Sequence, residues 1–188
     1  ILLIADEIVT GTGRSGKFLC LDHFGISADL TNLAKGLAGG YASLGATLVS
    51  KRVAETIEVG RRRMAEVHNH SGNPLACATG LAVLDVIENE KLVSNAEKMG
   101  EYLKELLTET FSDCNLIGDF RGLGLMQAIE YKQPESDREP LPESIGMIEN
   151  LNRELWNAGV LLNNIAFRSP LVSDCTMFVP SLAVTADL

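Results

Sequence analysis

An acidic side chain directly follows the first apolar segment of the chain. Residues 1–5 read Ile-Leu-Leu-Ile-Ala and are followed by Asp6. A short apolar run without alternation predicts a buried parallel strand, and open parallel sheets bind ligands beyond the carboxyl ends of their strands. A partly buried carboxylate at such an end needs a cationic partner. Asp6 is therefore a candidate binding residue, although an aspartate that only caps its own turn would look the same in sequence.

A lysine among apolar residues is the second candidate. Lys35 is the only charged residue between Asp29 and Lys51. Apolar surroundings favour a neutral amine, because desolvation disfavours the ammonium form. A neutral amine can attack an aldehyde and form a Schiff base. The alternative is a lysine whose side chain lies along the end of a helix closed by Gly36.

A glycine-rich stretch between these two residues matches two phosphate-binding patterns. Gly11, Gly13 and Gly16 have the spacing of a dinucleotide fingerprint, and Gly16-Lys17 could end a P-loop. The first pattern requires a strand, a tight turn and a helix, but the residues after Gly16 have no helical period. The second requires a hydroxyl side chain where the sequence has Phe18. We therefore expect a turn-rich loop and no phosphate site.

Strands and helices alternate along the rest of the chain, which indicates an α/β or α+β fold. Besides residues 1–5, apolar patterns predict strands at 46–50, which we expect to be buried, at 121–131, entered through a glycine turn, and at 174–185. Helical patterns cover 51–64, 74–111 with a break near 89–91, and a segment from 144 that stops at Gly159 and is followed by a strand. The residues between 132 and 144 contain three prolines among acidic residues and predict a loop.

Composition narrows the possible partners. The chain has 188 residues and a formal charge of −9, so nothing favours binding to nucleic acid. No apolar run approaches the roughly 20 residues that cross a membrane. The four cysteines contain no C-x-x-C pair, which is typical of reduced thiols in a cytoplasmic protein.

Four segments together resemble the class III aminotransferases, the ornithine, GABA and omega-amino-acid group of fold-type I pyridoxal phosphate enzymes. In order, they are residues 5–18 (ADEIVTGTGRSGKF), 28–50 (ADLTNLAKGLAGGYASLGATLVS), 68–88 (HNHSGNPLACATGLAVLDVIE) and 120–130 (FRGLGLMQAIE). The resemblance implies an α/β fold-type I transferase. Residues 1–75 would belong to the large cofactor domain and residues 76–188 to the connecting helix and a small α+β domain. It also implies a homodimer.

The resemblance also implies roles for individual residues. Lys35 resembles the lysine that holds pyridoxal 5'-phosphate as a Schiff base and then moves the proton. Asp6 resembles the carboxylate that pairs with the pyridine nitrogen, which keeps the ring an electron sink. Ile8 corresponds to a valine that packs on one face of the ring. Asn69 stands where a threonine usually donates to the phosphate of the neighbouring subunit, and an amide can donate the same bond.

Among the departures from the family pattern, three concern residues that would contact the cofactor or the substrate. Val9 stands where a glutamine often binds the phenolic oxygen of the cofactor, and Asn69 replaces the threonine. Met177 stands where many members have an arginine that binds a substrate carboxylate, and methionine cannot form that bidentate pair. Either the substrate is recognised differently or another arginine, such as Arg168, takes this role.

The implied reaction is transfer of an amino group from an amine or an amino acid to a 2-oxo acid. The alternatives are another pyridoxal phosphate reaction on the same fold, such as racemisation or decarboxylation, and a non-catalytic fragment of such an enzyme. We expect the sequence to be the later part of a longer chain. Alone it would then bind cofactor poorly, show no activity and expose apolar sheet edges.

Overall fold

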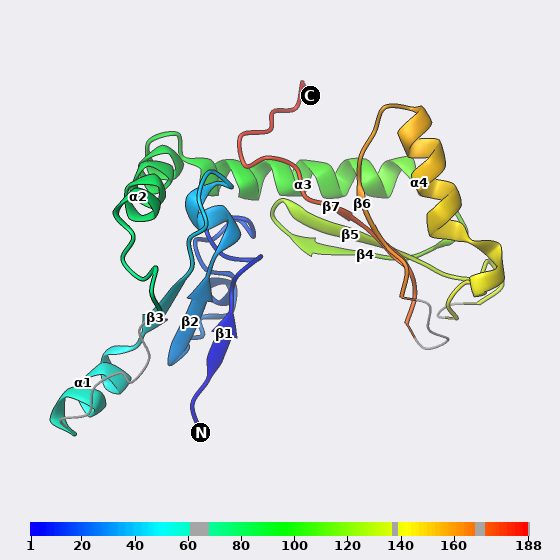
Figure 1. Cartoon of the computed structure of the whole chain (residues 1–188). Coiled ribbons are helices and arrows are strands. Elements are labelled where there is room, and N and C mark those ends of the chain that lie inside the picture. Colours follow the sequence, from blue (N-terminus) through cyan, green and yellow to red (C-terminus); the bar gives the residue numbers. More distant parts are fainter. Residues whose placement is uncertain (61–67, 137–138, 168–171, 188) are drawn as a thin grey trace. The chain divides into compact units, whose positions relative to one another are not determined.

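The chain folds into two compact units, Ile1–Ala96 and Glu97–Leu188. The structure is a computed structural model that describes residues 1–60, 68–136, 139–167 and 172–187 (Figure 1). The units divide within one helix, and each is described by itself below. The predicted division into a cofactor-domain part (1–75) and a small domain (76–188) concerns the domains of a larger enzyme and stays a prediction.

The first unit is built on a three-stranded sheet in the order β1-β2-β3. The strands are β1 (Ile4–Asp6), β2 (Leu30–Leu33) and β3 (Ala46–Val49). β1 and β2 run parallel, and β3 is antiparallel to β2. The helices of this unit are α1 (Lys51–Val59) and α2 (Pro74–Asn89), with two short 3-10 helices, η1 (Cys20–Phe24) and η2 (Lys35–Ala38). The predicted parallel strand at the start of the chain is confirmed, whereas sequence reasoning did not identify β2.

The burial predicted for two of these strands is wrong for the chain as described. Ile4 on β1 is 59% exposed and Leu48 on β3 is 46% exposed. β1 is an edge strand with one neighbour, and Leu3 and Ile4 leave an apolar surface at that edge, as predicted. Both strands were expected to be buried because a uniformly apolar strand is typical of a sheet that is covered on both faces. The described residues do not cover Ile4 and Leu48.

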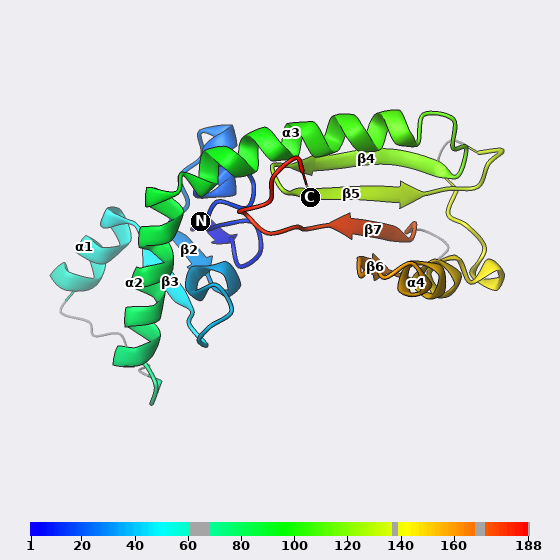
Figure 2. The same ribbon diagram turned by 90° about the horizontal axis from the view of Figure 1, so that it is seen from above.

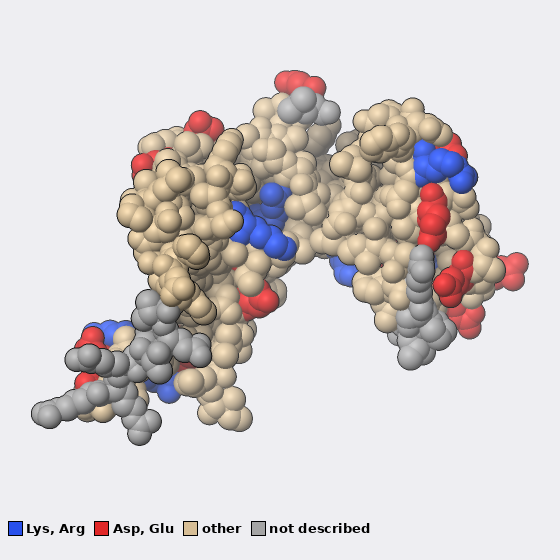
Figure 3. Space-filling view, viewed as in Figure 1, with Lys and Arg blue, Asp and Glu red and all other residues tan. Residues whose placement is uncertain are grey.

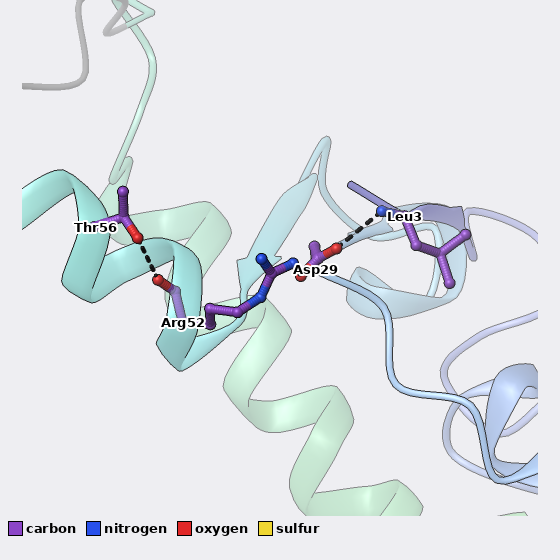
Figure 4. Close-up of polar contacts among 4 residues, drawn as sticks. All are labelled: Leu3, Asp29, Arg52 and Thr56. Atoms are coloured by element: carbon purple, nitrogen blue, oxygen red, sulfur yellow. Dashed lines mark hydrogen bonds and ion pairs between the residues drawn. The ribbon is translucent and has the colours of Figure 1, made fainter. Parts of the chain in front are cut away.

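Asp29 joins three elements at the amino end of the parallel strands. Its Oδ2 atom accepts a hydrogen bond of 2.9 Å from the backbone N–H of Leu3, and its Oδ1 atom pairs with the guanidinium of Arg52 on α1 (Figure 4). Its backbone carbonyl accepts the Ser50 N–H at 2.9 Å. The bond from Leu3 and then the Arg52 guanidinium lower the pKa of Asp29. This aspartate therefore ties β1 and α1 to the start of β2.

We expect Asp29→Asn to lower the thermal stability at pH 7, because asparagine cannot form the ion pair with Arg52. The folded pKa is depressed, so the contribution is present above the ordinary aspartate pKa of about 3.9 and is lost as the pH falls below it. Thermal unfolding at pH 7 and at pH 3 checks this: the two proteins should differ at pH 7, and the difference should be smaller at pH 3. A constant difference across both pH values, or an equal loss in the exposed Asp85→Asn control, would contradict it.

The second unit is a four-stranded antiparallel sheet in the order β4-β5-β7-β6. Its strands are β4 (Ile117–Leu123), β5 (Met126–Tyr131), β6 (Asn163–Ile165) and β7 (Cys175–Phe178), and its helices are α4 (Met147–Asn157), the 3-10 helix η3 (Glu143–Ile145) and most of α3 (Leu92–Thr110). The glycine turn predicted before the strand at 121–131 is confirmed at Gly124, with φ 52°, and β5 follows it. The turn joins β5 to β4 in a hairpin, which the sequence did not predict.

The core of the second unit lies between the sheet and its two helices. Leu107 of α3, Ile129 and Tyr131 of β5, and Ile148 of α4 form one buried cluster. Figure 2 shows α3 running along β4 and β5. The buried Tyr131 hydroxyl is paired with the Thr176 hydroxyl of β7 at 2.7 Å, and burial raises the pKa of this tyrosine. The cluster explains why the apolar residues of α3 lie on one stripe.

The predicted break in the long helical segment is confirmed. α2 ends at Asn89 and α3 begins at Leu92, and Lys91 between them has φ 53°. The predicted end of the next helix is also confirmed, because α4 ends at Asn157 and Gly159 follows at φ 75°. No helix of the described ranges is both long enough and apolar enough to cross a membrane.

Gly100 marks the closest approach of α3 to the β4–β5 turn. A Cβ atom at this position would lie 2.2 Å from the carbonyl carbon and oxygen of Gly124. These are backbone atoms of a tight turn, so they cannot rotate away. Only glycine fits at this point of the helix.

We expect Gly100→Ala to lower the free energy of unfolding by about 3 kcal/mol, because helix and turn must separate. The direction of the change in the free energy of unfolding is informative. In a helix with free space around the glycine, the same substitution would stabilise the protein by about 1 kcal/mol. Chemical denaturation measures the effect, with the exposed Lys104→Ala on the same helix as the control. A stabilised Gly100→Ala protein would show that the close approach does not exist.

Candidate active site

Asp6 and Lys35 come from the same edge of the sheet in the first unit. Asp6 is the last residue of β1, and it pairs in register with Asn32 of the parallel strand β2. Lys35 follows β2 after one intervening residue and opens η2. Both side chains are exposed. The structure therefore brings the two predicted site residues to the carboxyl ends of neighbouring parallel strands, where open sheets bind their ligands.

The backbone of Lys35 is held in an uncommon conformation. Its φ is 44°, in the left-handed region that residues other than glycine rarely adopt. The next turn is closed by hydrogen bonds from Leu37 N–H to the Ala34 carbonyl at 2.9 Å and from Gly39 N–H to the Gly36 carbonyl at 3.1 Å. Such strain costs about 1–3 kcal/mol and persists only where the surroundings impose it. It points to a constraint on where the Lys35 side chain goes.

Asp6 is exposed, while its neighbour Glu7 is the buried carboxylate. Side chains alternate along a strand, so Ala5 and Glu7 face the covered side of the sheet and Asp6 faces the other. The Oδ1 atom of Asp6 accepts the N–H of the half-buried Ile8 at 3.1 Å. The expectation of a buried aspartate is therefore wrong for these residues alone, and the local turn that sequence left as the alternative is present.

A polar row crosses the open face of the sheet beside Asp6. In register with Asp6 are Asn32 of β2 and then Thr47 of β3. The Thr47 hydroxyl donates to the Asn32 side-chain oxygen at 2.8 Å. Sequence reasoning missed both residues. The alternation in Leu-Thr-Asn-Leu was a possible signal, but only the register shows that this row continues from Asp6.

The glycine-rich stretch forms a loop of turns, as predicted. Residues 8–15 are turns, and the first helix after them is the 3-10 helix at Cys20. Gly11 lies against Leu33 of β2, where a Cβ atom would be 2.6 Å from Leu33 Cδ2. The absence of a side chain at Gly11 therefore allows the loop to pack closely against β2, the strand that precedes Lys35. Among the described residues there is also no group of three or more His, Cys, Asp or Glu side chains that could hold a metal ion.

Asn69 lies apart from these residues in the hydrogen-bonding network. It is exposed in the turn that precedes α2, and Asn73 caps that helix by accepting the Ala76 N–H at 3.1 Å. No hydrogen bond or ion pair among the described residues joins Asn69 to Asp6 or Lys35. Its predicted contact with a cofactor phosphate involves a neighbouring subunit and stays a prediction.

Met177 lies in the second unit, in apolar surroundings. It is on β7, with its sulfur 3.7 Å from the Asn163 side-chain nitrogen, and it lines a groove of about 940 Å³ together with Leu106, Leu161 and Phe178. Arg168, the alternative arginine, lies outside the described residues.

Arg121 lies in the same row of the sheet as Met177, because it pairs with Ala128 of β5, which in turn pairs with Met177 of β7. It is paired with Asp119 at 3.0 Å and with Glu130, and these carboxylates raise its pKa. Its charge is therefore already matched within the β4–β5 hairpin. Figure 3 shows blue and red side chains in small groups on the viewed face, separated by uncharged surface.

Comparison with known proteins gives the class and then the family of this chain. The fold is that of part of a transaminase, since solved transaminase structures match over the whole chain. The family model of class-III aminotransferases matches residues 1–188, so the chain belongs to the class III aminotransferases. It has part of the fold-type I architecture of pyridoxal phosphate enzymes, as predicted.

Individual relatives support this assignment. The chain is 37% identical over its whole length to a 5-aminovalerate aminotransferase of Pseudomonas aeruginosa, of which it covers 44%, and 35% identical to a diaminobutyrate–2-oxoglutarate transaminase of Halomonas elongata, of which it covers 39%. The crystal structure of an amine transaminase from an uncultivated Pseudomonas species in its PLP-bound form matches with a TM-score of 0.89 and 39% identity, over the whole chain and 41% of that structure. The chain thus spans about two fifths of the length of these relatives.

Proposed function

We propose that the protein is a pyridoxal phosphate-dependent transaminase in which Lys35 and Asp6 hold the cofactor. The observation that carries this proposal is the pairing of β1 with β2, which sets an exposed carboxylate and an exposed lysine at one edge of the sheet. Membership of the class III aminotransferases supports it, since these are pyridoxal phosphate enzymes. The two charges are opposite, which suits a ligand that offers both a protonated nitrogen and an aldehyde.

Each residue has a defined part in this proposal. When bound, the cofactor supplies an electron sink that stabilises negative charge at the substrate carbon. The Lys35 amine would hold the cofactor through its aldehyde, and it would take and return the proton that moves during transamination. The Asp6 carboxylate accepts a charge-assisted hydrogen bond from the pyridine nitrogen and keeps it protonated.

Ile8 and Asn69 complete the proposed site. Ile8 is half-buried directly after the Asp6–Glu7 pair, and we assign it the apolar contact with one face of the ring. Asn69 has an exposed amide, which suits a donor to the phosphate of a neighbouring subunit. This second role requires a homodimer, which is part of the proposal.

The proposed substrates are an amine or omega-amino acid as donor and a 2-oxo acid as acceptor. The names of the relatives support this class: one acts on 5-aminovalerate, one pairs diaminobutyrate with 2-oxoglutarate, and one is an amine transaminase. We propose a cytoplasmic location on the basis of the cysteines, which are all free.

Half-reaction spectroscopy tests the proposal. The intact protein loaded with cofactor is mixed with a panel of amines and omega-amino acids. We expect the absorbance of the lysine-bound cofactor to disappear with a good donor and to return when a 2-oxo acid is added. Release of carbon dioxide, or inversion of the amino acid without any need for a 2-oxo acid, would instead indicate a decarboxylase or a racemase.

A further inference from the structure

Glu7 is a buried carboxylate that the proposed chemistry does not use. It is 3% exposed, and a buried charge is costly unless hydrogen bonds satisfy it. One of its oxygens, Oε1, accepts the Leu21 N–H at 2.9 Å, and the other accepts the Thr10 hydroxyl. Its backbone N–H donates to the Asn32 carbonyl of β2 at 3.0 Å. Glu7 therefore fastens the loop that follows β1 at both of its ends.

The fastened loop lies against the residues on both sides of Lys35. The Gly11 N–H donates to the Glu7 carbonyl at 3.0 Å, which turns the chain so that Gly11 meets Leu33, two residues before Lys35. The next residue, Thr12, is 2% exposed and lies beside Gly36, the residue after Lys35. A Cβ atom at Gly36 would lie 3.6 Å from Thr12 Cβ.

We propose that Glu7 is a positioning residue for Lys35, acting through the loop that it anchors. The carboxylate fixes Thr10 and η1, the loop between them presses on Leu33 and Gly36, and this contact holds the left-handed backbone of Lys35. Without the anchor the loop loosens, and Lys35 relaxes toward ordinary backbone angles that send its side chain elsewhere. The chemical consequence rests on the function proposed above, whereas the support of the backbone can be measured without cofactor.

Amide hydrogen exchange in the intact protein tests the support directly. We expect Glu7→Gln to speed exchange about tenfold at the Leu37 and Gly39 amides, which close the turn after Lys35, because local opening becomes easier. The Ser50 amide, at the other end of β2, should keep its rate. Asp29→Asn is the matched control, and it should show the reverse pattern: faster exchange at Ser50 and unchanged rates at Leu37 and Gly39.

The pH titration of the lysine-bound cofactor absorbance gives a second readout. We expect its midpoint to shift in Glu7→Gln and to stay unchanged in Asp29→Asn, because only the first change moves Lys35. Uniform acceleration of all three amides, or an unshifted midpoint together with unchanged exchange at Leu37 and Gly39, would overturn the proposal and leave Glu7 as a purely structural residue. If the wild-type protein showed no lysine-bound absorbance at all, the proposed function would fail, while the exchange pattern would still decide the role of Glu7.

Thr10 offers a milder pair of variants in case Glu7→Gln does not fold. Thr10→Val keeps the shape but removes the hydroxyl that bonds to Glu7, and Thr10→Ser keeps the hydroxyl. We expect faster exchange at Leu37 and Gly39 in the valine variant and wild-type rates in the serine variant. Equal rates in the two variants would contradict the role given to the Glu7 carboxylate.

Discussion

Lys35→Ala is expected to abolish transamination, with a loss of about 10⁴-fold in kcat. The same change should remove the absorbance of the lysine-bound cofactor, because the proposed cofactor amine, the one that follows β2, is gone. The substitution should leave the backbone conformation at residue 35 unchanged. Lysine and alanine both carry a Cβ atom, so the strain at φ 44° is the same in both proteins.

The control for Lys35→Ala is Lys51→Ala. Lys51 is an exposed lysine at the start of α1 in the same unit, and it pairs with Glu55 one turn away. This variant should keep wild-type activity and wild-type absorbance. An active Lys35→Ala protein would end the assignment of a lysine-bound cofactor to this site.

Asp6→Asn is expected to lower kcat by about 10²- to 10³-fold, the size of effect seen when one charge-stabilising group is removed from an active site. The amide cannot keep a pyridine nitrogen protonated, so the electron sink weakens. The local fold should survive, because the asparagine oxygen can still accept the Ile8 N–H that bonds to Asp6 Oδ1. Steady-state kinetics measures the loss in kcat, and thermal unfolding measures whether the fold survives.

Asp29→Asn serves as the comparison for Asp6→Asn. It also neutralises an aspartate next to the same pair of strands, but at their amino ends, away from the proposed site. We expect it to cost stability and to leave kcat unchanged. If the two variants lost activity equally, Asp6 would have no specific part in the chemistry.

The sequence predicted the strand that carries Asp6 because residues 1–5 are uniformly apolar and end at a charged pair. It predicted the helix break near residue 90 because the apolar stripe changes there. It did not predict β2, since Leu-Thr-Asn-Leu is short and half polar. It predicted the glycine turn before β5 but not β4, because Ile-Gly-Asp-Phe-Arg-Gly-Leu is not an apolar run. The direction and exposure of β3 depend on its partners and are not encoded in its own residues.

For the candidate site, too, some residues could be identified from the sequence and others only from the structure. Lys35 and Asp6 were identified from their types, their neighbours and the family resemblance, and strand pairing then brought them to one edge. Glu7 could not be distinguished from Asp6 in the sequence, because only the alternation of the strand and the fold of the following loop decide which carboxylate is buried. Asn32 and Thr47 became visible only through the register of three strands.

The most direct test of the central claim is to locate the bound cofactor on the chain. The intact protein is saturated with pyridoxal phosphate, reduced with borohydride, digested and mapped by mass spectrometry. The account predicts one modified peptide, with the adduct on Lys35, and a much lower yield of that peptide in Asp6→Asn. An adduct confined to another lysine, or none under saturating cofactor, would contradict it.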